Sequence, residues 1–226
     1  MRIAVGFARA VTKSPPVGLC GACVELLVVS GAGITVMGGA QSGPLCVSSP
    51  RMATLEDLQY TMGIGPCQDA FSFGQPVHVP RLDGNAVARW PSFVTEAREA
   101  GILSVFAYPL SVNGAMIGVM TLYQDSEGSL TVAQHDDSVA VAAVLTETVL
   151  SLQAAEPLGV LAPSLESAAS YRAEVHQASG MISIQLQIPV ADALVRLRGY
   201  AFANDQPVGG VAADVVARRL RFNDSR

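Results

Sequence analysis

The stretch from Ser104 to Tyr123, SVFAYPLSVNGAMIGVMTLY, decides the fold. It contains two apolar runs, 104–110 and 115–123, with the pair Asn113-Gly114 between them. Asn and Gly readily adopt the positive φ angles that a tight hairpin turn requires, so this dipeptide is a strong hairpin signal. The stretch therefore predicts two adjacent antiparallel strands.

Further strands and helices are predicted on both sides of this hairpin from short β-branched runs and from apolar residues at helical spacing. The predicted strands are 34–37, 45–47 and 76–79, and the predicted helices are 17–29, 51–61, 92–100 and 131–152. This order predicts an α+β domain, in which helices pack against one face of an antiparallel sheet.

A change of character near residue 156 predicts a domain boundary. The run Glu156 to Pro163 contains two Pro and one Gly, which interrupt regular structure. We therefore expect a first domain at 1–155, a linker at 156–164 and a helical domain at 165–226. The predicted helices of that last part are 165–187, 190–204 and 207–222.

Composition limits the function classes. The 226 residues are 50% hydrophobic and 15% charged, with a formal net charge of −5, which excludes a disordered tail and a globally cationic coat. A surface for nucleic acid must therefore be local. Residues 171–226 hold seven Arg against five acidic residues, so the C-terminal part is the basic one. The N-terminus has no signal-peptide pattern and no window reads as a clean membrane span, so we expect a soluble, cytoplasmic protein.

Three segments of the C-terminal part, 174–182 (EVHQASGMI), 193–201 (ALVRLRGYA) and 211–216 (VAADVV), resemble an ANTAR module. ANTAR modules are three-helix RNA-binding domains of bacterial antiterminators. The first domain is similar to a GAF domain in its order of elements, and 19–27 (LCGACVELL) and 89–93 (RWPSF) resemble the GAF portion of actinobacterial GAF-ANTAR regulators. The resemblance implies a regulator, not an enzyme, that binds paired hairpins in nascent RNA and promotes antitermination under control of a sensor domain.

The candidate RNA contacts are residue types that stack on unpaired bases or contact phosphates. They are His176, Gln177, Ser179, Arg196, Arg198, Tyr200, Arg218 and Arg219. Arg196 and Arg198 project about 200° apart on a helix, so only one of them is forced outward. Other members of the ANTAR family often carry Lys where this chain has Ser179, which removes one expected phosphate contact.

The first C-terminal helix also carries a seam of Tyr171, Val175, Ala178, Ile182 and Gln185 at alternating spacings of four and three. Such a seam suits a coiled-coil dimer, or burial against the second and third helices, and the sequence leaves both open. A homodimer would set two basic faces at a fixed separation for two RNA hairpins. A dimerising adaptor that binds no RNA is a further hypothesis.

In the first domain we expect a small-molecule pocket or an equally apolar packed core. Its candidate walls are Phe71, Trp90, Phe93, Phe106 and Tyr108. No cofactor or metal site is predicted, because the only Cys-x-x-Cys pair, Cys20 and Cys23, has no second pair to complete a zinc site. The alternative function is a thiol-based redox sensor or thiol enzyme that uses Cys20, Cys23 and Cys67, although buried small hydrophobic residues are the simpler role for Cys20 and Cys23.

Overall fold

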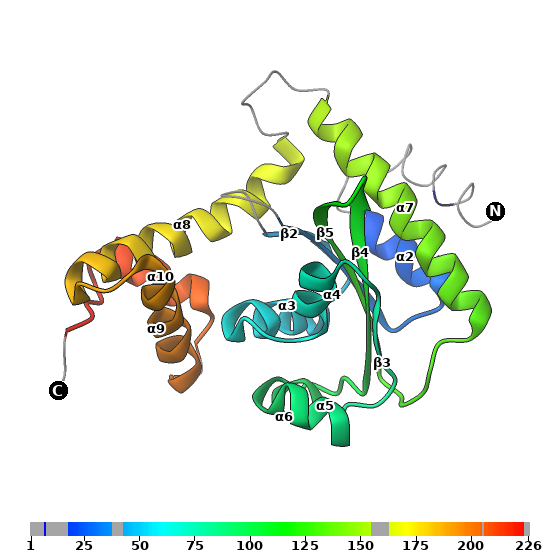
Figure 1. The fold of residues 1–226 in the computed structure, drawn as a ribbon, viewed down its shortest axis with the longest axis horizontal. Helices are drawn as coiled ribbons and strands as arrows, with labels where there is room; N and C mark the ends of the chain where they lie inside the picture. The colour runs from blue at the N-terminus through cyan, green and yellow to red at the C-terminus, as the bar shows by residue number, and fades with distance from the viewer. Residues whose placement is uncertain (1–6, 8–17, 38–42, 155–162, 205, 224–226) are drawn as a thin grey trace.

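The computed structural model describes Phe7 and residues 18–37, 43–154, 163–204 and 206–223. Its centre is one five-stranded antiparallel sheet with the strand order β2-β1-β5-β4-β3 (Figure 1). The strands are β1 (Gly31–Val36), β2 (Gly43–Val47), β3 (Val77–Val79), β4 (Ser104–Val112) and β5 (Ala115–Gln124). The helices up to residue 154 are α2 (Leu19–Leu27), α3 (Pro50–Met62), α4 (Pro66–Phe73), α5 (Gly84–Arg89), α6 (Pro91–Glu99) and α7 (Val132–Ala154).

The predicted hairpin is confirmed as β4 and β5. Val112 pairs with Ala115, and between them Asn113 and Gly114 have φ angles of 49° and 82°. Two consecutive left-handed residues make the turn whose twist matches that of the strands. The hairpin places β5 in the middle of the sheet, where it pairs with β1 as well as β4.

One face of the sheet packs against α2 and α7. Ile34, Met120 and Tyr108 occupy paired positions on three neighbouring strands, so their side chains share this face. The α2 and α7 residues packed against this face include Leu27 and Leu145, and all five side chains are at most 1% exposed. This face therefore forms the larger apolar core.

The opposite face is covered as well, by α3 to α6, so the prediction of helices on one face only is wrong (Figure 1). Val105 and Tyr123, which pair across β4 and β5, pack here with Leu55 of α3 and Phe93 of α6. A strand buried on both faces reads as a nearly continuous apolar run rather than an alternating one. The stretch 104–123 has this character, which is the signal for two helical layers.

Two short helices, α4 and α5, were not predicted. α4 begins at Pro66, whose fixed φ suits the first helical turn, and ends at Gly74 with φ of 65°. With eight and six residues, α4 and α5 are too short for a helical period to emerge from the sequence.

The C-terminal part forms the three predicted helices, α8 (Pro163–Leu186), α9 (Val190–Ala203) and α10 (Val208–Val216). Three residues of the predicted seam, Val175, Ala178 and Ile182, are fully buried among α9 and α10, so this part of the seam packs within the three-helix unit. α8 begins at Pro163, inside the predicted linker, and the rest of that linker lies outside the described residues except for its last position. α10 ends six residues before the predicted Phe222, because Arg218 adopts a left-handed φ of 60°.

Among the described residues, no single helix is both long and apolar enough to cross a membrane. The segments Ala173–Leu186 and Val190–Ala203 pass that test only jointly, across a bend of 105°.

A disulfide joins Cys20 of α2 to Cys46 of β2, across 26 residues of sequence. The sequence reading of Cys20 as a buried small hydrophobic residue is therefore incomplete. Cys23 and Cys67 are buried and are not part of a disulfide.

The close approach of β1 to β5 yields a first prediction. A Cβ atom added at Gly118 would lie 2.2 Å from the carbonyl oxygen of Thr35, which is backbone and cannot move aside. We expect Gly118→Ala to lower the free energy of unfolding by about 2 kcal/mol in urea titrations. Gly21→Ala on the exposed side of α2 is the control, because nothing lies within 4 Å of its added Cβ. It should be neutral or slightly stabilising, and equal losses in both variants would contradict this account.

The disulfide yields a second prediction. Closing a loop of 26 residues lowers the entropy of the unfolded chain, so reduction should lower the free energy of unfolding by about 3 kcal/mol. Urea titrations with and without dithiothreitol measure this difference. The Cys20→Ala/Cys46→Ala variant is the control and should not respond to the reductant. Four reactive thiols in the denatured, unreduced wild-type protein, instead of two, would contradict the pairing.

Candidate functional site

The segment that follows α10 lies against both α8 and α9 and creates an uneven, basic surface. The backbone N–H of Phe222 donates to Oε1 of Gln185 on α8 at 2.9 Å. The ring of Phe222 meets that of Tyr200 on α9 edge-on, with centroids 5.3 Å apart. A shallow pocket of about 250 Å³ beside it is lined by Met181, Ile184, Gln185, Arg218 and Arg221. We call this area, made of Met181, Ile184, Tyr200, Arg218, Arg221 and Phe222, the tail surface.

Five of the eight predicted RNA contacts are exposed on the surface of the three-helix unit. They are His176, Gln177, Arg196, Tyr200 and Arg218. Arg218 and Tyr200 belong to the tail surface, and Arg196 lies one helical turn before Tyr200 on the same side of α9. Gln177 shares a stripe of α8 with Met181 and Ile184, whereas His176 points about 100° away from that stripe.

The other three predicted contacts are held by the protein itself. Ser179 is fully buried and its hydroxyl donates to the Val175 carbonyl at 2.8 Å. Arg219 makes a two-pronged contact with Asp214, at 2.8 Å from Nε and 2.7 Å from Nη2. Arg198 is half-buried and faces α3, where its guanidinium lies 5.4 Å from the centre of the Tyr60 ring. The predicted set therefore does not form one continuous surface.

Arg221, Met181 and Ile184 were missed by the sequence reading. The side chain of Ile184 is 80% exposed and lines the same shallow pocket as Met181 and Arg221. Gln177, Met181 and Ile184 follow the i, i+4, i+7 spacing of one helical stripe, which is the signal that could have found two of them. Arg221 lies beyond α10, and its position depends on the turn at Arg218.

The five aromatic residues predicted to line one pocket are divided between the two faces of the sheet. Phe106 and Tyr108 belong to the core under α2 and α7. Trp90 and Phe93 belong to the core under α3, α5 and α6, and Phe71 packs beside Cys67 in a third cluster. They serve as core residues, and the prediction of a shared pocket is wrong.

A different pocket, of about 310 Å³, opens beside the edge strand β3 and α5. Its lining residues are Val77, His78, Val79, Pro80, Arg81, Asp83, Asn85, Ala86, Arg89 and Trp90. Trp90 is the one predicted pocket residue that reaches it. We call this cavity the β3 pocket.

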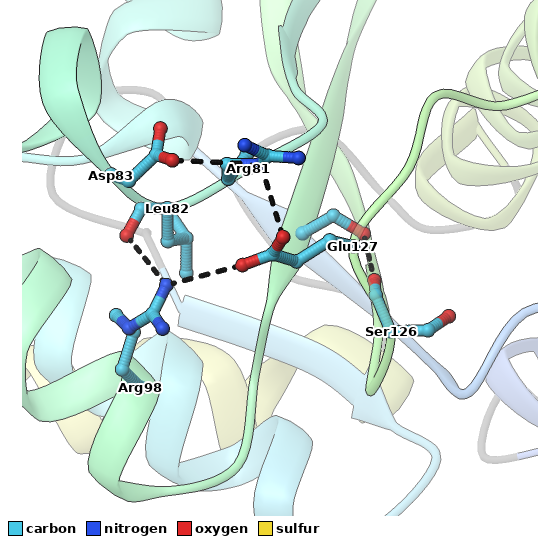
Figure 2. Close-up of polar contacts among 7 residues, drawn as sticks. Arg81, Leu82, Asp83, Arg98, Ser126 and Glu127 are labelled. Carbon is cyan, nitrogen blue, oxygen red and sulfur yellow. Dashed lines mark hydrogen bonds and ion pairs between the residues drawn. The ribbon is translucent and has the colours of Figure 1, made fainter.

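The rim of the β3 pocket is held by an ion-pair network (Figure 2). Arg81 contacts Asp83 at 3.5 Å and Glu127 at 3.0 Å. Arg98 of α6 approaches Glu127 at 3.6 Å and donates to the Leu82 carbonyl at 3.1 Å. Exposed pairs of this kind contribute little stability singly, but together they fix the loop that follows β3.

The charged groups around the β3 pocket are paired with neighbours. Arg89 contacts Asp69 at 2.5 Å, and its guanidinium lies 4.7 Å from the Trp90 ring and 5.8 Å from the Phe73 ring. On the far side of β3, His78 meets His135, with ring centroids 4.9 Å apart. Partial burial, together with the charge of His135, lowers the pKa of His78. His78 is therefore mainly neutral at pH 7.

The cysteines do not assemble a thiol site. Cys20 is paired with Cys46, and Cys23 and Cys67 lie in different apolar clusters, on opposite faces of the sheet. Burial raises the pKa of Cys23 to about 12, which leaves almost no thiolate at neutral pH. Among the described residues, no group of three or more His, Cys, Asp or Glu side chains is placed to hold a metal ion.

Comparisons with solved structures find the same fold in proteins of low sequence identity. A GAF domain of a phosphoenolpyruvate-protein phosphotransferase from Acinetobacter aligns with a TM-score of 0.53 and 10% identity, over 70% of this chain and 96% of that one. The corresponding domain from Coxiella burnetii gives 0.50 and 11%, over 68% and 94%. A free methionine-R-sulfoxide reductase from Neisseria meningitidis gives 0.50 and 14%, over 68% and 90%.

No match is found among curated proteins. The family model of the GAF domain matches residues 17–151, which is more than half of the chain and contains the whole sheet, α2 to α6 and most of α7. The chain therefore belongs to the GAF domain family.

Proposed function

We propose that this protein is a cytoplasmic transcriptional regulator in which the GAF domain senses a signal and the α8–α10 unit binds hairpin RNA in nascent transcripts to promote antitermination. The observation that carries the proposal is the tail surface, where Arg218 and Arg221 flank exposed apolar and aromatic side chains. The three-helix architecture and the ANTAR-like segments support the same reading.

The chemistry of the tail surface suits RNA loops. Guanidinium groups bind phosphates and stack on bases, and exposed rings such as Tyr200 accept unpaired bases. Ile184 offers an apolar contact that remains in water in the absence of a partner. A homodimer would present two such surfaces. Once one hairpin of a transcript is bound, the second hairpin would be held near the other surface at a high effective concentration.

The GAF domain supplies the sensing function, because it offers the β3 pocket beside an edge strand. At about 310 Å³ the pocket falls at the lower end of the usual size for small-molecule sites. We propose that a small ligand binds there, against the indole of Trp90 and the polar side chains of Asn85 and Asp83.

A regulatory role is favoured over a catalytic one. The thiol alternative would require reactive Cys20, Cys23 and Cys67, but the first is in a disulfide and the pKa of the second is raised to about 12. An adaptor without RNA would not need the exposed arginines of the tail surface.

RNA binding is tested with an RNA of two tandem hairpins, selected by crosslinking to the full chain in cells. We expect Arg218→Ala/Arg221→Ala to weaken binding about tenfold in fluorescence anisotropy, because two phosphate contacts are lost. The slope of log Kd against log salt should also fall by about 1.5.

Arg81→Ala/Arg98→Ala is the matched control, since it also removes two positive charges, from the exposed GAF rim and far along the chain from the tail surface. Its RNA affinity should equal that of the wild type. Equal weakening by all these substitutions would show that net charge, and not the tail surface, determines binding. Failure to crosslink any RNA would refute the proposal.

A further inference from the structure

Arg198 and Arg196 are two residues apart on α9 and face different surroundings. Arg196 is exposed, whereas Arg198 is half-buried and its Nε atom is shielded from solvent. The guanidinium of Arg198 lies over Tyr60 of α3, and a Cβ atom at Gly63 would be only 2.5 Å from its Nη1. The side chain of Arg198 therefore packs closely against the C-terminal end of α3.

Tyr60 anchors the contact from the GAF side. It belongs to α3, yet it is 8% exposed and packs in the same apolar cluster as the buried residues of α8, α9 and α10. An aromatic ring under a partly desolvated guanidinium gives a directional attraction. α3 thus carries a surface, made of Tyr60, Met62 and Gly63, that fits one face of α9.

The contact between α3 and α9 is narrow. A cleft of about 290 Å³ that reaches from Leu58 of α3 to Pro207 lies along it, and a second of about 270 Å³ reaches from Ile64 to Val195. Met62 and Phe202 line both clefts. Phe202 and Val195 remain 45% and 66% exposed, so much of the apolar surface at this junction is still in water. A contact of this size can open without unfolding either part.

We propose that the surface formed by Tyr60, Met62 and Gly63 is an intramolecular docking surface for α9 that competes with hairpin RNA for Arg198. In the docked state the guanidinium is occupied by Tyr60, and the three-helix unit binds RNA only through the tail surface. Undocking of α9 releases Arg198 to contact phosphate. The competition rests on the proposed RNA-binding function, whereas the docking itself does not.

Tyr60→Leu in the full chain is the direct test, because leucine keeps an apolar side chain in the cluster and removes the aromatic face. We expect faster amide hydrogen exchange in 190–203 and an RNA affinity about fivefold higher. The gain should vanish in Tyr60→Leu/Arg198→Ala. Phe73→Leu is the matched control, since it removes another aromatic partner of an arginine, Arg89, within the GAF domain. It should change neither measurement.

Gly63→Ala is a second variant that disturbs the same contact between α3 and Arg198. It keeps the docking surface testable if Tyr60→Leu fails to fold. Its Cβ would displace Nη1 of Arg198, and its φ of 67° adds backbone strain. Gly74→Ala is its control, because φ is 65° there and the nearest atom, Sδ of Met116, is 3.7 Å away. We expect faster amide exchange in α9 and tighter RNA binding for Gly63→Ala, and no change in either measurement for Gly74→Ala.

Unchanged exchange in α9 for both Tyr60→Leu and Gly63→Ala would overturn the docking surface. Faster exchange with an RNA affinity equal to that of the wild type would overturn the competition and leave the proposed function intact. Faster exchange with no RNA binding by any variant, wild type included, would refute the proposed function and the competition, and would uphold the docking surface alone.

Discussion

Burial of the sheet on both faces is the constraint on which the rest of the structure depends. β5 lies in the middle of the sheet, and the side chains on both of its faces are removed from water. Leu122 is buried under α2 and α7, and Tyr123 is buried under α3 and α6. Such a strand requires a helical layer on each side. α3 belongs to the second layer, and it is also the helix on which α9 docks through Tyr60. α3 therefore connects the GAF core to the helical unit, in addition to the contact between β2 and α8.

Local signals were sufficient for most of the elements of this fold. Asn113-Gly114 predicted the hairpin because its φ angles are a property of the dipeptide itself. The arrangement of the helical layers is harder to predict from local sequence. A run that is apolar at both odd and even positions fits either a fully buried strand or a buried helix segment. α4 was missed because its eight residues, Pro66–Phe73, are too few to show a helical period, although Pro66 and Gly74 mark its two ends. The short length of α4 and the packing of distant segments on the sheet determined these features, and residue spacing in the sequence does not reveal either.

The candidate sites were less predictable than the fold, because they depend on contacts between distant segments. Spacing drew attention to Cys20 and Cys23, but the partner of Cys20 is Cys46 on another element, and only the packing of α2 against β2 brings them together. Helical geometry correctly required Arg196 and Arg198 to diverge. Which of the two faces solvent depends on where α3 lies, and no residue of α9 encodes that.

The two sides of α3 link α4 to α9 through consecutive residues. Gln59 is 1% exposed, and its side-chain oxygen accepts the backbone N–H of Cys67, in the first turn of α4, at 2.7 Å. Tyr60, the next residue, holds Arg198. Because an α-helix moves largely as a rigid rod, a rotation of α3 that lengthens the first contact must also shift the ring under the guanidinium. Energetic coupling needs an element with two discrete arrangements, and α9, docked or released, is such an element. A change in how α4 packs on the sheet would therefore reach α9 without any large displacement of the GAF core.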